Sequence, residues 1–166
     1  YAGDKVFKGI FNHFQEKTGG QVEKEINFTA SSVFSDSFHP QNVASFENQN
    51  KVFRSGNSEN NWICFDFKEH RVVPTHYTIK SRKCRPNDIH PRSWVVEGSA
   101  DESSWETIDA ESNCSYLNGR NLVHTFALNH PKTTKFRYIR MRCTGPDWSN
   151  TYYLMLDSFE IYGRLI

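Results

Sequence analysis

The sequence predicts an all-β protein: a jelly-roll sandwich of two antiparallel sheets preceded by one short N-terminal helix. Three observations predict this fold class. Aromatic residues make up 14% of the 166 residues, and such a share favours strands and aromatic sheet packing over a helical bundle. Apolar and polar residues alternate in short runs, which is the period of a strand. Gly, Pro, Asn and Ser separate these runs at regular intervals, as is typical of sandwiches and barrels.

The first expected element is an amphipathic helix between Asp4 and Lys17. Four aromatic or aliphatic residues recur at the spacing of one helical face, namely Phe7, Ile10, Phe11 and Phe14. We expect Asp4 to cap the start of this helix and Gly19-Gly20 to end it. Because 166 residues is about the size of one domain, residues 1–20 are interpreted as the helical leader of a single domain spanning residues 1–166.

The strands follow after the period changes to two. The clearest is Asn61 to Lys68, where Ile63, Phe65 and Phe67 alternate with Trp62, Cys64 and Asp66. Further strands are expected at Thr75 to Ser81, Ser93 to Ser99, Trp105 to Asp109, Leu122 to Leu128, Phe136 to Thr144 and Tyr153 to Gly163.

Charge and motif content argue against several function classes. Twenty Lys and Arg against nineteen Asp and Glu give a net charge of +1, whereas nucleic-acid-binding domains are usually strongly basic. The short motifs of hydrolases, metalloproteases and nucleotide-binding enzymes are missing. No two of the seven His are spaced i, i+4 to share a metal. We therefore expect no enzyme, no cofactor and no nucleic-acid partner, and the apolar runs are too short to span a membrane.

The four cysteines bear on the cellular compartment. Cys64, Cys84, Cys114 and Cys143 lie twenty or more residues apart, which does not fit the spacing of a structural zinc site. We expect four reduced thiols and a cytoplasmic protein, whereas two disulfides would indicate a secreted one. Cys84 and Cys114 fall in polar loops and are expected to be the more reactive thiols. For Cys84, the neighbouring Lys83 and Arg85 favour the thiolate.

Several of the expected strands share an ordered pattern of aromatic and glycine residues. Its most specific part is the run from Ser93 to Asp101, Ser-Trp-Val-Val-Glu-Gly-Ser-Ala-Asp, followed by Trp105. Phe159-Glu160-Ile161-Tyr162-Gly163 closes the pattern, and Trp62 to Phe67, Tyr77 to Ile79 and Phe136 to Arg140 complete it. Over nearly the whole chain this pattern resembles the discoidin domain, also called the coagulation factor V/VIII C-type domain. The resemblance implies a galactose-binding-like jelly roll whose ligand loops gather at one end.

Most residues of this pattern are expected to have structural roles. We expect Trp94 and Trp105 to fill the core, Gly98 to permit a tight strand exit, and Asp101 to begin a turn. Function therefore has to be argued from the loops.

The leader carries a second, finer resemblance. Phe7-Lys8-Gly9-Ile10 followed by Gly19-Gly20 is similar to the leader of discoidin-like domains in intracellular BTB-containing proteins and ubiquitin-ligase components. Secreted coagulation members join their two termini by a disulfide, and this chain has no Cys before position 64 or after position 143.

Two loops have the composition of a binding site. Lys80 to Arg92 has a local charge of +4 and is stiffened by Pro86 and Pro91, which lowers the entropic cost of binding. Its arginines match carboxylates and phosphates; the alternative is a solvated charged loop. The turn Thr144 to Tyr152 carries Trp148 in a polar context, which suits sugar stacking or a protein hot spot. Packing against a neighbouring loop is the alternative.

The resemblance places both loops at the ligand end of the fold. It implies a site made of Arg82, Arg85, Asn87, His90 and Trp148, which Ser35 to His39 or Arg54 to Asn57 could close. Many sugar-binding relatives hold calcium in an acidic loop. The corresponding Ser45 to Asn50 has one carboxylate, and because a hard cation needs several anionic oxygens, we expect no metal here.

The leading hypothesis is a non-catalytic binding module of a larger intracellular protein that recognises a protein or peptide through its loop end, in the manner of a ubiquitin-ligase substrate adaptor. A carbohydrate-binding module for galactose or N-acetylhexosamine is the alternative. Anionic lipid ranks third, because it requires apolar residues projecting from the loops, for which only Phe34, Phe38 and Trp148 are candidates.

Overall fold

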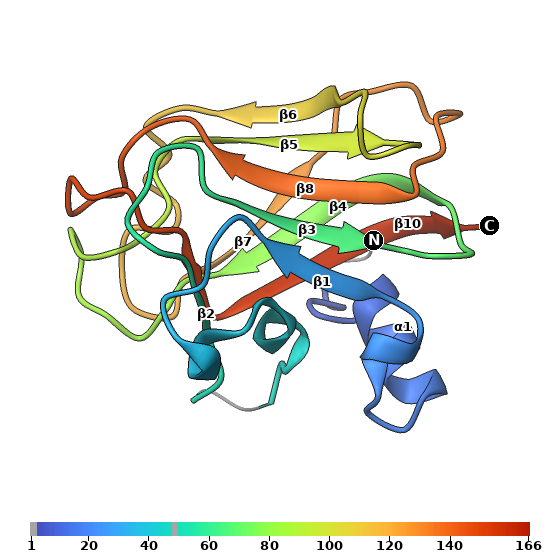
Figure 1. Cartoon of the computed structure of the whole chain (residues 1–166), viewed down its shortest axis with the longest axis horizontal. Coiled ribbons are helices and arrows are strands. Elements are labelled where there is room, and N and C mark those ends of the chain that lie inside the picture. Colours follow the sequence, from blue (N-terminus) through green and yellow to red (C-terminus); the bar gives the residue numbers. More distant parts are fainter. Residues whose placement is uncertain (1–2, 48–49) are drawn as a thin grey trace.

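The computed structural model describes residues 3–47 and 50–166 and consists of two antiparallel sheets packed face to face (Figure 1). The larger sheet has the order β1 (Asn27–Ala30), β3 (Trp62–Asp66), β8 (Tyr138–Cys143), β5 (Trp94–Ser99) and β6 (Glu106–Glu111). The smaller sheet has the order β10 (Ser158–Leu165), β4 (Val72–Lys80) and β7 (Val123–Ala127). The predicted jelly-roll class is confirmed.

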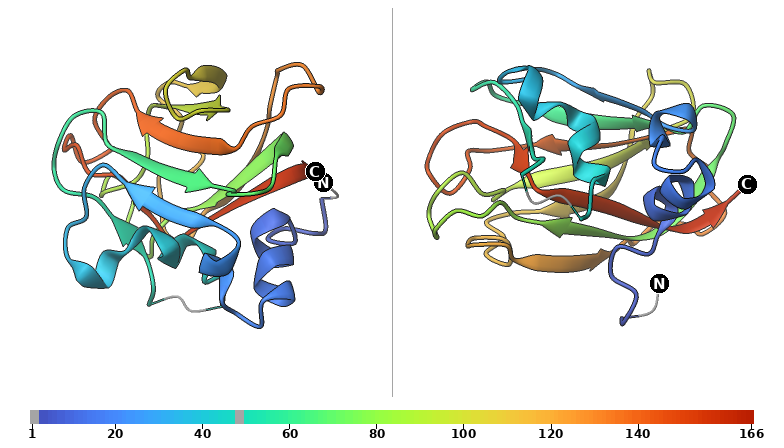
Figure 2. Two further views of the ribbon diagram at one scale, coloured as in Figure 1. Left: turned by 45° about the vertical axis from the view of Figure 1, so that its right-hand side comes forward. Right: turned by 90° about the horizontal axis from the view of Figure 1, so that it is seen from below.

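Shorter elements complete the fold at its edges. β2 (Phe53–Arg54) pairs with β9 (Met155–Leu156) as a separate two-stranded ladder. The helix α1 (Ile10–Lys17) lies beside β10, and three 3-10 turns follow it in the chain: η1 (Val22–Lys24), η2 (Asp36–Phe38) and η3 (Pro40–Ala44). The C-terminal end of β10 lies on the side of α1 (Figure 2).

The core is formed by the inward faces of the two sheets. Alternate residues of β3 and β8 point inward, so that Ile63, Phe65 and Ile139 are fully or almost fully buried. Trp94 fills the core as expected, and its indole N–H donates to the Tyr77 hydroxyl at 3.0 Å. This bond satisfies the one polar group that the indole carries into the apolar interior.

Two expectations for the motif residues are wrong. Trp105 is half-buried rather than in the core, because it lies just before β6 and its ring covers the guanidinium of Arg140, 3.8 Å from the ring centre. Gly98 lies inside β5 and not at a strand exit. A Cβ at this position would meet the Phe136 ring at 2.5 Å, so the glycine makes room for an aromatic ring. Asp101 does begin a turn, since its carboxylate accepts the N–H groups of Ser103 and Ser104.

The helix begins later than the apolar pattern predicts, and Asp4 does not cap it. Gly9 is the N-cap residue, and a glycine has no side chain that could cap the helix. The buried Glu160 of β10 accepts the N–H groups of Gly9, Phe11 and Asn12 at 3.1, 2.8 and 3.0 Å instead. Burial raises the pKa of Glu160 to about 7, although these N–H groups favour the carboxylate.

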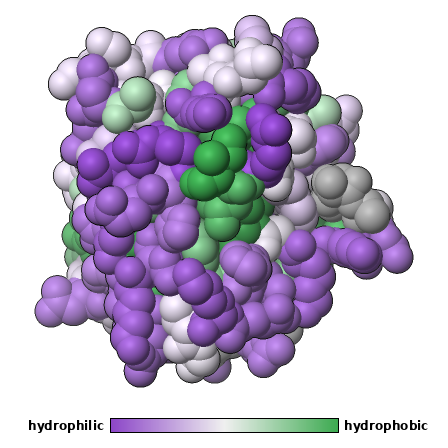
Figure 3. Space-filling model, turned by 90° about the vertical axis from the view of Figure 1, so that its right-hand side faces the viewer, coloured by the Kyte–Doolittle hydropathy of each residue, from purple (hydrophilic) through white to green (hydrophobic). Residues whose placement is uncertain are grey.

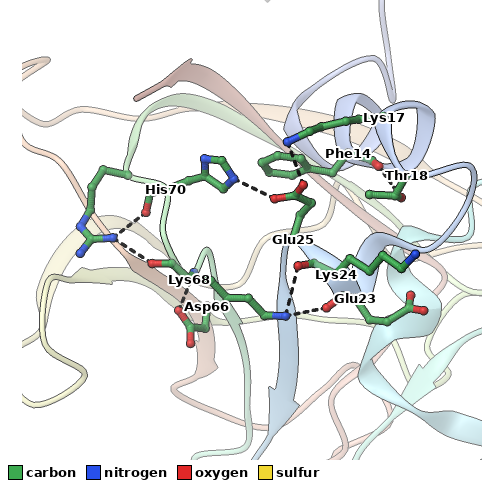
Figure 4. Close-up of polar contacts among 10 residues, drawn as sticks. Phe14, Lys17, Thr18, Glu23, Lys24, Glu25, Asp66, Lys68 and His70 are labelled. Atoms are coloured by element: carbon green, nitrogen blue, oxygen red, sulfur yellow. Dashed lines mark hydrogen bonds and ion pairs between the residues drawn. The ribbon is translucent and has the colours of Figure 1, made fainter.

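The other end of α1 matches the prediction. Gly20, with a φ of 93°, donates its N–H to the Gln15 carbonyl at 2.8 Å and so ends the helix. Beyond it, the Glu25 carboxylate contacts both Lys17 and His70 at 2.8 Å (Figure 4). The hydrogen bonds from Lys17 and His70 lower the pKa of Glu25. This contact joins the end of α1 to the turn between β3 and β4.

The predicted strands are present with shifted limits, and β1 and β2 were not predicted. The expected strand Tyr153 to Gly163 is divided into β9 and β10 at Asp157, whose N–H donates to the Lys80 carbonyl. β4 begins at Val72 and includes Pro74, which lies opposite Gly163 at an irregularity of the ladder. A proline can occupy a strand at such a bulge because no ladder N–H is needed there.

Within residues 3–47 and 50–166, no helix is long and apolar enough to cross a bilayer.

Candidate functional site

The candidate site lies at the end of the sandwich opposite α1, where five segments meet at the left of Figure 1: residues 31–39, 55–61, 81–93, 112–122 and 144–154. We call this region the loop end. Its loops contain all five residues that the resemblance implies for ligand binding, Arg82, Arg85, Asn87, His90 and Trp148.

Asp147 organises the segment 144–154. Its buried carboxylate accepts the backbone N–H groups of Ser149, Thr151 and Tyr153 at 2.8 to 3.2 Å, and the hydroxyls of Ser149 and Thr151 at 2.6 Å. A single side chain therefore determines the path of this loop and limits its freedom in the absence of a ligand.

Asn61 connects three segments of the loop end. Its amide nitrogen donates to the carbonyls of Gly56, Ser58 and Tyr152, and its amide oxygen accepts the hydroxyls of Ser31 and Ser32. The residue is 1% exposed. It is therefore part of the framework that holds the loops and not part of their surface.

His90 is fully buried and supports the basic loop from inside. Its Nε2 lies 3.1 and 2.9 Å from the carbonyl oxygens of Cys84 and Arg85, and its own carbonyl accepts the N–H of Trp148. The imidazole has no exposed edge with which to touch a ligand. Of the five residues that the resemblance implies, His90 is thus a positioning residue.

Trp148 packs against neighbouring loops, which is the alternative that the sequence left open. Its indole N–H donates to the Cys114 carbonyl at 3.1 Å, and the Arg92 guanidinium lies 4.7 Å from the ring centre. The residue is half-buried, so only part of its ring faces solvent.

The remaining three residues of the implied set lie in one loop but do not converge. Arg85 and Asn87 are exposed, and Asn87 exchanges two hydrogen bonds with Asn118. Arg82 is half-buried and donates to the sulfur of Met155 in β9 at 3.4 Å. The loop therefore presents Arg85 to solvent and directs Arg82 toward β9.

On the other side of β9 lies a feature that sequence reasoning missed. The guanidinium of Arg54 lies near two rings that are inclined to each other by 71°, 3.9 Å from the centre of Phe34 and 4.4 Å from that of Tyr153. Its buried Nε has no hydrogen-bond partner, and no carboxylate of the described residues pairs with it. Phe34 is 49% exposed. The three residues are far apart in the sequence, and only the fold brings them together.

A small pocket lies beside the 144–154 loop. It has a volume of about 230 Å³ and is lined by Glu59, Asn60, Thr144, Gly145, Pro146 and Tyr152. Its polar groups and the Tyr152 ring are the chemistry of a small polar ligand site.

In the part of the chain that the structure describes, no group of three or more His, Cys, Asp or Glu is arranged to hold a metal ion. In the segment Ser45 to Asn50, which the resemblance aligns with a calcium loop, positions 48 and 49 lie outside the described residues.

All four cysteines are free thiols in the structure. Burial raises the pKa of both Cys64 and Cys143 to about 12. Cys114 is 7% exposed and burial raises its pKa as well, so the expectation that it is a reactive thiol is wrong. Cys84 is half-buried in the basic loop, and its reactivity stays a prediction.

Two curated relatives are ubiquitin ligases. The chain is 30% identical over 96 residues to E3 ubiquitin-protein ligase hecd-1 of Caenorhabditis elegans, and 30% identical over 108 residues to E3 ubiquitin-protein ligase Ufd4 of Drosophila melanogaster. These matches cover 57% and 63% of the chain but 4% of each relative's length.

Solved structures of similar fold are carbohydrate-binding proteins by their descriptions. The module CpGH89CBM32-5 of Clostridium perfringens, in complex with GalNAc-β-1,3-galactose, has a TM-score of 0.64 at 12% identity, with 85% of this chain and 97% of that one covered. The fucolectin of Morone saxatilis has a TM-score of 0.65 at 16% identity, with coverages of 84% and 47%. At these identities the likeness concerns the fold. The model of the F5/8 type C domain matches residues 27–157, and the chain belongs to this family.

Proposed function

We propose that residues 1–166 form a non-catalytic binding module of a larger intracellular protein, and that the loop end recognises an acidic segment of a protein partner. One observation carries this proposal: the Arg54 guanidinium lies against Phe34 and Tyr153 and has no anionic partner among the described residues.

A guanidinium in contact with aromatic rings is oriented before a ligand arrives. Contact with the two rings restricts the rotation of the Arg54 side chain while its terminal N–H groups stay available, so less entropy is lost when a carboxylate binds. Arginine and tyrosine are also the residues that most often dominate protein interfaces.

The basic loop adds positive charge near Arg54. Arg54 pairs with Met155 across the β2–β9 ladder, and Arg82 donates to the sulfur of that same methionine. Arg85, exposed in the same loop as Arg82, adds a third positive charge at the loop end. Because no salt bridge within the described part of the chain neutralises these arginines, a partner with carboxylates fits them better than a neutral one.

The similarity to two ubiquitin ligases supports a role in recruiting proteins to such an enzyme. The share of those relatives that is matched, 4%, is that of an accessory module.

The test is affinity capture from cytosol with the immobilised chain and a double variant, Arg54→Ala with Arg85→Glu. We expect the variant to lose the proteins that the unmodified chain retains. Arg164→Glu is the matched control, because Arg164 is exposed on β10 near the opposite end and the substitution makes the same charge change as Arg85→Glu. If the double variant and the control retain the same proteins as the unmodified chain, the loop end is not the recognition surface.

A second candidate is sugar binding, and the pocket beside Tyr152 favours it. Its volume of about 230 Å³ suits one hexose, and Tyr152 offers a ring face for stacking. Titration with galactose or N-acetylgalactosamine to millimolar concentration, monitored by amide NMR, tests this candidate. Shifts confined to residues 144–152 that Tyr152→Ala abolishes would support it, and an unchanged spectrum would exclude it.

A further inference from the structure

The outer face of the five-stranded sheet carries a cluster of arginines and tryptophans that the loop end does not use. Ile63, Met141 and Val96 point into the core. Their strand neighbours therefore point outward. Outward side chains of β3, β8 and β5, together with the Trp105 ring from just before β6, form a cluster on this face. We call it the arginine–tryptophan face: Trp62, Arg142, Glu97, Arg140 and Trp105.

One carboxylate fixes both arginines of this face. A single oxygen of Glu97 accepts the Nε–H of Arg142 at 2.8 Å and that of Arg140 at 3.1 Å. Burial by itself would raise the pKa of Glu97, but the hydrogen bonds from Arg142 and Arg140 outweigh it and lower the pKa. Two guanidinium groups therefore share one negative charge, and a surplus of positive charge remains.

The donors that point away from Glu97 are unused. Among the described residues, neither the terminal nitrogens of Arg140 and Arg142 nor the indole N–H groups of Trp62 and Trp105 have a hydrogen-bond acceptor. Arg140 is covered by the Trp105 ring at 3.8 Å, and Trp62 lies opposite Arg142 in the β3–β8 ladder. The face thus combines two guanidinium groups with two half-buried aromatic rings.

The other charges of the sheet face leave this surplus in place. Asp66 is already bound by Arg137 through two hydrogen bonds of 2.8 and 3.1 Å. Glu102 is exposed in the turn after β5, and its charge contributes to raising the pKa of Tyr138, at the other end of β8 from Arg142. The region around Arg142 and Trp62 is therefore the most favourable for an anion.

No described helix covers this face. The contacts of α1 and of the 3-10 turns are made with β10, β1 and β2, and Figure 1 shows the upper side of the β6–β5–β8–β3 layer without a helix over it. The apolar patch seen from the end of the sandwich in Figure 3 belongs to a different side of the molecule.

We propose that the arginine–tryptophan face is a second binding surface, and that it takes an acidic peptide segment. Its carboxylates would accept hydrogen bonds from the terminal nitrogens of Arg140 and Arg142, and its chain would lie against Trp62 and Trp105. Charge complementarity selects this partner, because two guanidinium groups share the one carboxylate of Glu97 and their terminal nitrogens are unused donors. Arg and Trp are also characteristic of binding hot spots.

The four tryptophans provide a direct test, because their indole N–H signals in NMR spectra report separate regions. Trp62 and Trp105 report the sheet face, Trp148 the loop end and the fully buried Trp94 the core. The probe is an acetylated hexaglutamate peptide at low salt, with hexaglutamine as the control. We expect hexaglutamate, and not hexaglutamine, to shift the signals of Trp62 and Trp105 while Trp94 stays unchanged.

Variants decide whether the arginines cause the shift. Arg142→Gln should weaken the response of Trp62 and Trp105 about tenfold, and leave any response of Trp148 unchanged. An unshifted Trp94 signal confirms that the variant is folded; if it is not, Trp62→Phe replaces it, with the Trp105 signal as reporter and the same weakening expected. The proposal is overturned if Trp62 and Trp105 do not respond at millimolar peptide, or if they respond equally in the variant. Because Trp148 is read separately, failure here does not depend on the loop end.

Discussion

Each end of the sandwich is organised by one buried carboxylate that accepts backbone N–H groups, but the two carboxylates act over different distances along the chain. Glu160 accepts N–H groups from residues about 150 positions earlier. Asp147 accepts them from residues no more than six positions later. The cap of α1 therefore depends on β10, whereas the 144–154 loop has its organiser within it.

The difference matches what each end has to do. A contact between distant segments closes a long loop and links α1 to the fold cooperatively. A local contact gives a loop its shape without depending on the rest of the chain, and a loop with a fixed shape loses less entropy on binding. The 144–154 loop is thus shaped by a local contact, and the helix end by a contact that closes the fold.

The largest effect is expected from Glu160→Gln, which breaks the helix end. The amide cannot accept all three N–H groups of α1, and we expect a loss of about 3 kcal/mol or more at pH 5, because buried N–H groups are left facing the amide nitrogen, which cannot accept them. Urea unfolding monitored by far-UV circular dichroism measures this loss.

The pH dependence distinguishes this carboxyl from a simple packing defect. The pKa of Glu160 rises from 4.5 to about 7 in the folded state, so the folded chain binds more protons than the unfolded chain between these values. The stability that this group contributes is present in full below pH 4.5 and is lost as pH rises through 7, by about 3 kcal/mol. The difference between the original chain and Glu160→Gln should therefore shrink from pH 5 to pH 8. A constant difference would contradict the assignment.

A smaller and more local effect is expected from Asp147→Ala at the loop end. We expect a loss of about 2 kcal/mol, because several loop N–H groups and hydroxyls lose their acceptor but can turn to water. Hydrogen exchange should accelerate in residues 144–154 and not in α1. The variant should also accelerate thiol labelling of Cys114 more than that of Cys64, because the Trp148 indole N–H donates to the Cys114 carbonyl. Faster exchange in α1 would show that the two ends are coupled.

The sequence predicted the fold well because local patterns carry the strands. The alternation in Asn61 to Lys68 correctly predicted β3, and the glycines after α1 correctly predicted its end. Each of these features depends on residues that are neighbours in the chain. The start of α1 was wrong for the opposite reason: its cap is Glu160, and no local pattern indicates a partner so distant. β1 and β2 are short, four and two residues, and carry too little alternation to be recognised.

The position of the candidate residues in the loops was predicted, whereas their contacts were not, and the same physical distinction explains this difference. The basic loop and the Trp148 turn are contiguous, so their composition could be read directly. The contact of Arg54 with Phe34 and Tyr153 joins three separate segments. His90 was predicted to touch the ligand but is buried by the fold. A polar residue in a polar loop carries no local pattern that indicates burial.

The smallest effects come from two residues of the same loop, and they separate framework from surface. His90 is fully buried and lies within hydrogen-bond distance of two carbonyls, so His90→Ala should cost about 1 to 2 kcal/mol by leaving a buried carbonyl unsatisfied and opening a cavity. Arg85 is exposed and in no salt bridge, so Arg85→Ala should change the free energy of unfolding by less than about 0.5 kcal/mol. The two variants should differ in the opposite way in binding. Arg85→Ala should weaken capture of the partner without loss of stability, whereas His90→Ala should weaken capture only in proportion to its destabilisation of the loop. Urea unfolding together with capture measurements on both variants gives the comparison. A destabilised Arg85→Ala, or one that captures partners as well as the original chain does, would remove Arg85 from the proposed surface.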